Sequence, residues 1–262
     1  DWSTAASVDL ALAVYLSALC FGRRKLAHEG GTALAAVLHF RPLLHGHMPL
    51  SARAAKAFRA LVRPAERWPF SHTSMGAIVA TLLLLSEVEA AIIVAYAYNV
   101  VGRGQQDWAL PRLCDVHLPR SEHGAIGVSI GRSDRGERAK TGHDQGVMVR
   151  CPLVCAWLRA RVARLGPSSK RRLFSLSPQR YRELFSLALH ELGLPDETPH
   201  IIRHTAASVL ISRGAPLKEV MLAGRWGSVQ SVRRYAKPHL LGAHESTVDP
   251  SVLALGDRFW LD

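Results

Sequence analysis

The sequence contains few cysteines and few acidic residues, and each shortage excludes some classes of protein. Four cysteines in 262 residues are too few for a disulfide scaffold, and no second thiol pair accompanies Cys151 and Cys155. We therefore expect reduced thiols, no bound metal and an intracellular protein. Only 21 Asp and Glu stand against 33 Lys and Arg, which gives a formal net charge of +12. This excess favours a polyanionic partner, with nucleic acid ahead of an anionic membrane surface.

Long uninterrupted apolar segments are also lacking. The apolar stretch 76–100 carries Glu87 and Glu89 near its middle, so it predicts two buried helices and no membrane span. Ser86 to Glu89 has the pattern of a capping box, which predicts that the second helix begins there. The chain starts at Asp1 with neither a methionine nor a signal sequence, so we expect a fragment or a trimmed chain.

Helical apolar spacing recurs in the first third of the chain. It predicts helices over 8–19, 31–40 and 51–62, and prolines follow the last of them. The predicted divisions are 1–66 for a small helical domain, 67–72 for a linker, 73–240 for a larger domain and 241–262 for a tail. The apolar side chains of the tail need burial, on their own domain or on a neighbouring subunit.

The sequence pattern of the larger domain changes after its first two helices. The runs VHLP, GVSI and GVMV predict a small antiparallel sheet with an exposed basic hairpin. Helices then return, with start signals at Ser177 and Thr198, each before a proline, and stop signals at Gly166, Gly193 and Gly214. The predicted fold is mainly α with a small antiparallel β-sheet, an α+β class.

The segment PHIIRHTAAS, residues 199–208, has three interpretations. His200 and His204 have the spacing of a zinc pair, but a metalloprotease helix needs a glutamate where Ile201 stands, which disfavours a metal. An ordinary helix start is a second interpretation. The third is an anion site, because His200 and Arg203 share one face in the first turn of a helix, where free N–H groups favour negative charge.

Downstream residues favour the anion site. Trp226 and Tyr235 lie nine residues apart in AGRWGSVQSVRRYAKP. With these two in register behind His200 and Arg203, the segment resembles the signature of the tyrosine recombinase, or phage-integrase, family. The resemblance extends to residues 1–66, whose length and helical pattern are similar to those of the core-binding domain of that family.

The same resemblance implies an earlier arginine and a lysine. The arginine is Arg103 in the turn VGRGQQ, and the lysine is Lys140 in the predicted hairpin turn. The family has a glutamate three residues after the arginine, where this chain has Gln106 followed by Asp107. Asp115 also falls one residue later than the family spacing.

The implied reaction is the breaking and rejoining of DNA through a 3′-phosphotyrosine, without metal, ATP or other cofactor. The guanidinium groups of Arg103 and Arg203 are planar and stay charged, and their paired N–H donors can hold the oxygens of a phosphodiester. Tyr235 would be the nucleophile, although a phenol with a free pKa of about 10 needs activation. The other implied roles are a base or a phosphate hydrogen bond for His200, proton donation to the leaving 5′-oxygen for Lys140, and positioning for Trp226.

The partners implied are double-stranded DNA and other copies of the chain, as a dimer to a tetramer on DNA, with no membrane. Candidate contacts to the DNA backbone are Arg23, Arg24, Lys25, Lys170, Arg171 and Arg172. Two rivals stay open: a catalytically inactive DNA-binding protein derived from a mobile element, and a type IB topoisomerase, a family that tends to have lysine in place of His200. The expected compartment is the nucleus in a eukaryotic host and the cytoplasm or nucleoid otherwise.

Overall fold

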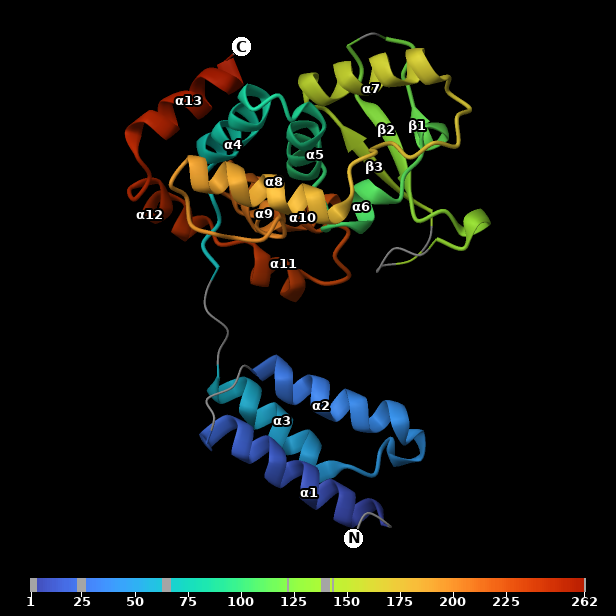
Figure 1. Cartoon of the computed structure of the whole chain (residues 1–262), viewed down its shortest axis with the longest axis vertical. Helices are drawn as coiled ribbons and strands as arrows, with labels where there is room; N and C mark the ends of the chain where they lie inside the picture. The colour runs from blue at the N-terminus through green and yellow to red at the C-terminus, as the bar shows by residue number, and fades with distance from the viewer. Residues whose placement is uncertain are drawn as a thin grey trace. The chain divides into compact units, whose positions relative to one another are not determined.

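The computed structural model describes residues 4–22, 27–62, 67–121, 123–137, 142 and 144–261. The chain divides into two compact units, Asp1–Glu66 and Arg67–Asp262 (Figure 1). Each unit has a hydrophobic core of its own. Four of the candidate functional residues lie outside the described residues: Arg23, Arg24, Lys25 and Lys140.

The first unit contains the three helices that the apolar spacing predicts. They are α1 (Ala5–Ser17), α2 (Ala27–Phe40) and α3 (Pro49–Leu61), with the π-helical turn η1 (Ala18–Gly22) after α1 and the 3₁₀ turn η2 (Pro42–Leu44) before α3. Val8, Leu12 and Leu16 recur every four residues along α1 and are buried in one cluster with Ala55 of α3. This shared apolar seam holds α1 against α3.

A buried carboxylate fixes the start of α3. Asp9 is 2% exposed, and its two carboxylate oxygens accept hydrogen bonds from the backbone N–H groups of Leu50 at 2.9 Å and Ser51 at 2.7 Å. These N–H groups belong to the first turn of α3, where no backbone partner exists within the helix. Asp9 therefore caps α3 and also opposes the positive end of its dipole.

Residues Ala5–Gly22 of the first unit are long and apolar enough to cross a membrane, judged by length and composition alone. Among the described residues this is the single helical stretch that meets both criteria. A third of it is buried inside the unit, and Leu12 and Leu16 belong to the core of three helices. A core helix of this kind satisfies the same criteria, so the stretch is weak support for a membrane span.

The second unit is built around α4 (His72–Leu84) and α5 (Val88–Asn99), which confirms the prediction of two buried helices in the apolar stretch. The predicted capping box is wrong. Ser86 has a left-handed backbone with φ of +62°, and Glu87 precedes α5 without a side-chain cap. Glu89 instead accepts hydrogen bonds from the N–H and the hydroxyl of Ser175, both at 2.6 Å, so a tertiary contact takes the carboxylate away from the helix start.

A three-stranded antiparallel sheet follows, as predicted. Its strands are β1 (Val116–His117), β2 (Ile126–Ile130) and β3 (Gln145–Val149), paired in the order β1-β2-β3. Val128 of β2 stands opposite Val116 and Val147, and all three are buried. Helix α7 (Pro152–Leu165) lies beside the sheet and shares its core (Figure 1). The fold is therefore mainly α with a small antiparallel sheet.

In the helices after the sheet the three stop signals and the start signal at Ser177 are confirmed. The start predicted at Thr198 is wrong, because α9 begins at Ile201, with His200 at its N-cap and no side-chain cap. Gly166, Gly193 and Gly214 all have positive φ, between +61° and +85°, as helix ends often require. Ser177 accepts a hydrogen bond from the N–H of Arg180 at 3.1 Å and so caps α8. The remaining elements are α6 (Gln106–Ala109), η3 (Leu113–Asp115), η4 (Ser133–Arg135), α8 (Pro178–Glu191), α9 (Ile201–Ser212), α10 (Leu217–Ala223), α11 (Val229–Tyr235), η5 (Pro238–Leu240), α12 (Leu241–Glu245) and α13 (Pro250–Leu261).

The tail packs on its own unit. Helix α13 runs along α4 (Figure 1). The two helices are so close that a Cβ on Gly256 would lie 1.9 Å from the carbonyl oxygen of Thr73. Trp260 stacks on the ring of His72 at 4.4 Å and donates its indole N–H to the His72 carbonyl at 2.9 Å. Of the two burial sites considered for residues 241–262, the structure therefore has the one within the same chain.

Candidate active site

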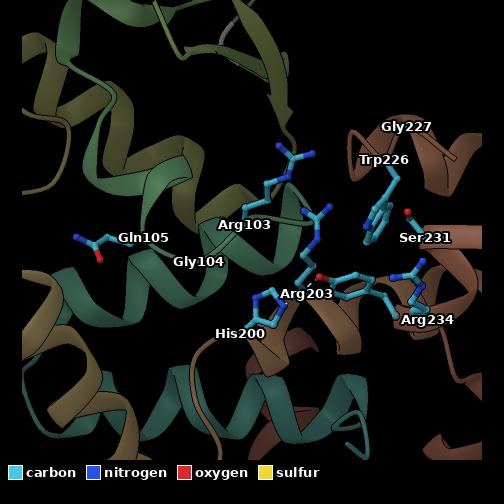
Figure 2. A pocket seen from close by; sticks show the side chains of 10 residues that line it. Arg103, Gly104, Gln105, His200, Arg203, Trp226, Gly227, Ser231 and Arg234 are labelled. Atoms are coloured by element: carbon cyan, nitrogen blue, oxygen red, sulfur yellow. Dashed lines mark hydrogen bonds between the residues drawn. The ribbon is translucent and has the colours of Figure 1, made fainter. Parts of the chain in front are cut away.

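A pocket of about 400 Å³ forms where the turn after α5, the start of α9 and the segment from α10 to α11 meet. Figure 2 shows the side chains of Arg203 and Trp226 facing each other, with Arg103 and His200 beside Arg203, whereas Gln105 points away from them. The lining residues are Arg103, Gly104, Gln105, His200, Arg203, Trp226, Gly227, Ser231, Arg234 and Tyr235. Residues from distant parts of the sequence thus converge on one cavity.

Arg203 forms the floor of this pocket. It extends from α9 and is 2% exposed, and its guanidinium donates to the carbonyl oxygens of Val101 at 2.6 Å and Gly224 at 2.5 Å. Burial, followed by the positive charges of Arg103 and Arg225, lowers the pKa of Arg203 to about 9. A fixed guanidinium whose charge is disfavoured by its surroundings is suited to an anionic ligand, because the anion would stabilise the charged form.

Arg103 lies beside Arg203, and Asp107 organises its turn. The Arg103 guanidinium donates to the Arg225 carbonyl at 2.5 Å, while its backbone N–H donates to the Asp107 carboxylate at 2.5 Å. Burial and then the charge of Arg225 lower the pKa of Arg103. Asp107 is 2% exposed and also pairs with the guanidinium of Arg225.

Asp107 and Asp115 lie at the two places where this chain departs from the family spacing. The acidic residue that contacts the Arg103 turn is Asp107, one position beyond Gln106, and Asp115 is late by the same single residue. Asp115 directly precedes β1, as the resemblance implies, and pairs with Arg135 at 2.7 Å.

Tyr235, at the end of α11, lies against two histidines. Its hydroxyl oxygen is 3.3 Å from Nε2 of His200, within hydrogen-bond distance. The ring of His204 lies 4.5 Å from the Tyr235 ring, tilted by 34°. Burial, then the charges of His200 and Arg67, lower the pKa of His204 to about 4, so His204 is neutral at neutral pH. Neutral His204 therefore supports the phenol ring, while His200 faces its oxygen.

Trp226 closes the pocket opposite His200. The Arg203 guanidinium lies 4.0 Å from the centroid of its ring, a cation–π contact, and the Tyr235 ring is 5.2 Å away. The ring also lies directly over Gly224, where a Cβ would come within 2.0 Å of it. Gly224 thus allows the indole to reach the two side chains.

Five of the six candidate catalytic residues line this pocket, and Lys140 lies outside the described residues. Lys170, Arg171 and Arg172 do not line it, and all three are exposed. The guanidinium of Arg172 donates to the carbonyl oxygens of Ala109 at 2.8 Å and Leu110 at 2.9 Å. Arg172 therefore stabilises the end of α6 in this structure, whereas Lys170 and Arg171 keep their predicted role as open candidates.

The described residues contain no group of three or more His, Cys, Asp or Glu side chains placed to hold a metal ion. His200 and His204, which have the spacing of a zinc pair, both lie against Tyr235. Their surroundings are aromatic and cationic, which suits an anion better than a divalent cation.

The sequence pattern alone indicates no role for Arg225, for Asp107 or, beyond the zinc interpretation, for His204. Asp107 carries a usable signal, because a lone acidic residue next to the expected glutamate position indicates a one-residue shift. Arg225 carries none, since its contact with Asp107 joins residues 118 positions apart.

The fold is that of tyrosine recombinases. Among solved structures it is similar to the XerH site-specific recombinase bound to difH substrate in a pre-cleavage complex, with a TM-score of 0.53 and 13% identity over 87% of this chain and 70% of that one. A post-cleavage complex of XerH with palindromic difH substrate gives a TM-score of 0.54, with 13% identity over 84% of this chain and 72% of the other.

The sequence comparisons agree with the fold. Residues 138–240 match the model of the phage integrase family. An integrase of Salmonella phage P22 is 39% identical over 64 residues, which is 24% of this chain and 16% of the relative. Tyrosine recombinase XerC of Bifidobacterium longum strain DJO10A is 37% identical over 54 residues, 21% of this chain and 15% of the relative. The matches thus span about a sixth of these relatives' length, and the family model matches less than half of this chain.

Proposed function

We propose that the protein is a site-specific DNA recombinase that breaks and rejoins DNA through a covalent 3′-phosphotyrosine at Tyr235. The observation that carries this proposal is a single pocket in which two guanidinium groups adjoin a tyrosine hydroxyl 3.3 Å from His200. Tyrosine recombinases are DNA strand-transfer enzymes, so the family and the pocket point to the same reaction class.

The two arginines would bind the scissile phosphate. A phosphodiester is anionic, and its transition state gathers charge on the non-bridging oxygens. Arg103 and Arg203 lie side by side along the pocket, each held by a main-chain carbonyl, so little reorganisation accompanies binding. The phosphate would also favour the charged form of Arg203, whose pKa is lowered to about 9 without it.

Cleavage then exchanges one phosphoester bond for another. The Tyr235 oxygen attacks phosphorus, a bond to the 3′-phosphate forms, and the bond to the 5′-oxygen breaks. The phenol proton passes to His200, whose Nε2 already faces the hydroxyl. Lys140 is the proposed proton donor to the departing 5′-oxygen. Attack by a 5′-hydroxyl reverses these steps and restores Tyr235, so the chemistry needs no cofactor.

Binding to double-stranded DNA is part of the proposal. The formal charge of +12 supports it, because contacts to the phosphate backbone supply most of the affinity of such proteins. The XerH complexes of similar fold contain difH substrate. We propose that copies of the chain assemble on DNA as a dimer to a tetramer, inside the cell.

The test is trapping on a nicked duplex. A binding sequence is selected from a random duplex library, and a nick beside the cleavage position lets a short 5′-end diffuse away so that rejoining fails. The wild-type protein should form a covalent adduct, and Tyr235→Phe should form none. Tyr15→Phe is the matched control, because Tyr15 is an exposed tyrosine on α1 of the first unit.

Each rival has its own outcome in the same test. Specific binding without any adduct would support an inactive DNA-binding protein and overturn the proposal. An adduct together with relaxation of supercoiled plasmid, but without exchange between two target sites, would support a type IB topoisomerase. An adduct that persists in Tyr235→Phe would place the nucleophile elsewhere.

A further inference from the structure

The turn after α10 holds both arginines of the pocket. Two consecutive carbonyl groups point at them: that of Gly224 accepts from Arg203, and that of Arg225 accepts from Arg103, each at 2.5 Å. The direction of one short main-chain segment therefore sets the direction of both guanidinium groups. A small rotation of this turn would move both donors away from a bound phosphate.

Arg225 occupies an uncommon backbone conformation in that turn. Its φ is +55°, in the left-handed region that a non-glycine residue rarely adopts. Such a conformation persists when surrounding contacts determine it. The contact here is an ion pair from the Arg225 guanidinium to the buried carboxylate of Asp107.

Asp107 connects this turn to the one that carries Arg103. Its carboxylate accepts from the Arg103 backbone N–H and from the Arg225 guanidinium. Both partners of the ion pair are at least nine-tenths buried. The three residues thus form a closed chain of contacts: Asp107 holds Arg225, the Arg225 carbonyl holds the Arg103 side chain, and Asp107 holds the Arg103 backbone.

The ion pair is poorly satisfied for a buried one. Among the described residues, Oδ1 of Asp107 and both Nε and Nη1 of Arg225 are buried without a hydrogen-bond partner. Buried polar atoms of this kind lower stability, and a well-packed apolar contact would avoid that cost. The pair therefore fixes the geometry of the turn and lowers the stability of the folded protein.

We propose that Arg225 is a positioning residue: its ion pair with Asp107 fixes the turn whose carbonyl groups aim Arg103 and Arg203 at the phosphate. This inference rests on the proposed function for the identity of the phosphate as DNA. It assigns Arg225 no contact with DNA. Arg225 acts through two other side chains.

Charge alone is the competing explanation, since Arg225 also adds a positive charge near the pocket. Asp107→Asn separates the two. Removing a negative charge beside the pocket would tighten phosphate binding if charge alone mattered. If positioning matters, the same change weakens binding, because the turn loses its anchor.

The experiment titrates the whole 262-residue chain with inorganic phosphate and follows the arginine side-chain NMR signals of Arg103 and Arg203. Arg225→Gln and Asp107→Asn should each weaken phosphate binding about tenfold or more, the usual effect of losing hydrogen bonds to a charged group. Arg225→Lys keeps a cation for Asp107 and should restore most of the affinity. The matched control is Arg182→Gln, because Arg182 is exposed on α8.

The same variants then react with the nicked duplex. Arg225→Gln should slow adduct formation at saturating DNA by about 100-fold, with the DNA concentration for half-saturation nearly unchanged. Unchanged phosphate affinity and adduct rate in Arg225→Gln would overturn the inference and leave the recombinase proposal standing. Phosphate binding without any wild-type adduct would overturn the recombinase proposal. The phosphate titration would still test the positioning role of Arg225. If Arg225→Gln fails to fold, Arg225→Gly replaces it, because glycine accepts the left-handed backbone.

Discussion

Replacing Gly224 with alanine should disturb the pocket through one steric contact. A Cβ at Gly224 would lie 2.0 Å from Cζ3 of Trp226 and 2.2 Å from its Cε3. Ordinary contact for such atoms begins at 3.4 Å, so the indole has to move by roughly 1.4 Å. The backbone of Gly224 is right-handed, with φ of −83° and ψ of −3°, so alanine adds no backbone strain. The displacement of Trp226 is therefore the whole perturbation.

This displacement of Trp226 affects both Arg203 and Tyr235. Trp226 lies 4.0 Å from the Arg203 guanidinium and 5.2 Å from the Tyr235 ring. A misplacement of this size in a reacting group costs about 100-fold in rate. The crowding itself should lower the free energy of unfolding by about 1–3 kcal/mol. Gly224→Ala should thus slow adduct formation far more than its modest loss of stability explains.

The assay is the single-turnover rate of adduct formation on the nicked duplex at saturating DNA, with denaturant unfolding measured alongside. Gly242→Ala is the control, because a Cβ on Gly242 meets nothing within 4 Å. It should match the wild-type protein in both measurements. A wild-type rate in Gly224→Ala would refute the argument that Trp226 must stay over Gly224 to complete the pocket.

Three further predictions concern separate parts of the second unit. Arg203→Lys should slow adduct formation by about 100-fold at unchanged DNA affinity, because lysine lacks the planar fork whose two nitrogens donate to separate carbonyl groups; an unchanged rate would contradict this. His204 has a folded pKa of about 4 against an ordinary 6.5, so its contribution to stability is present above pH 6.5 and is lost as the pH falls toward 4. His204→Phe should therefore flatten part of the pH dependence of unfolding between those values, and an unaltered slope would refute the assignment. Gly256→Ala should lower the free energy of unfolding by about 1–3 kcal/mol and expose α13 to protease, whereas equal stability to Gly242→Ala would exclude tight packing of α13 on α4.

Much of the fold could be predicted because its signals are local. Gly166 and Gly214 end helices where the chain needs a positive φ, and Ser177 caps a helix through the N–H of Arg180, three residues away. The start of α5 could not be predicted in the same way. Glu89 binds Ser175, a residue 86 positions later, and no short sequence window contains that competition.

The same distinction between local signals and tertiary contacts applies to the site. His200, Arg203, Trp226 and Tyr235 could be predicted from their spacing, since the family pattern records which residues converge in space. The role of Asp107 could be inferred only in part, because Asp107 lies one position beyond the expected glutamate and its contact with the Arg103 backbone is seen only in the structure. Contacts between backbone carbonyls and side chains are set by tertiary geometry, so they leave no trace in residue types.

The most direct test of the account is to identify the residue that becomes joined to DNA. After trapping on the nicked duplex, protease and nuclease digestion leaves one modified peptide for mass spectrometry. We expect a nucleotide attached through its 3′-phosphate to the Tyr235 oxygen. A phosphodiester on any other residue, or a specific protein–DNA complex that yields no modified peptide, would contradict it.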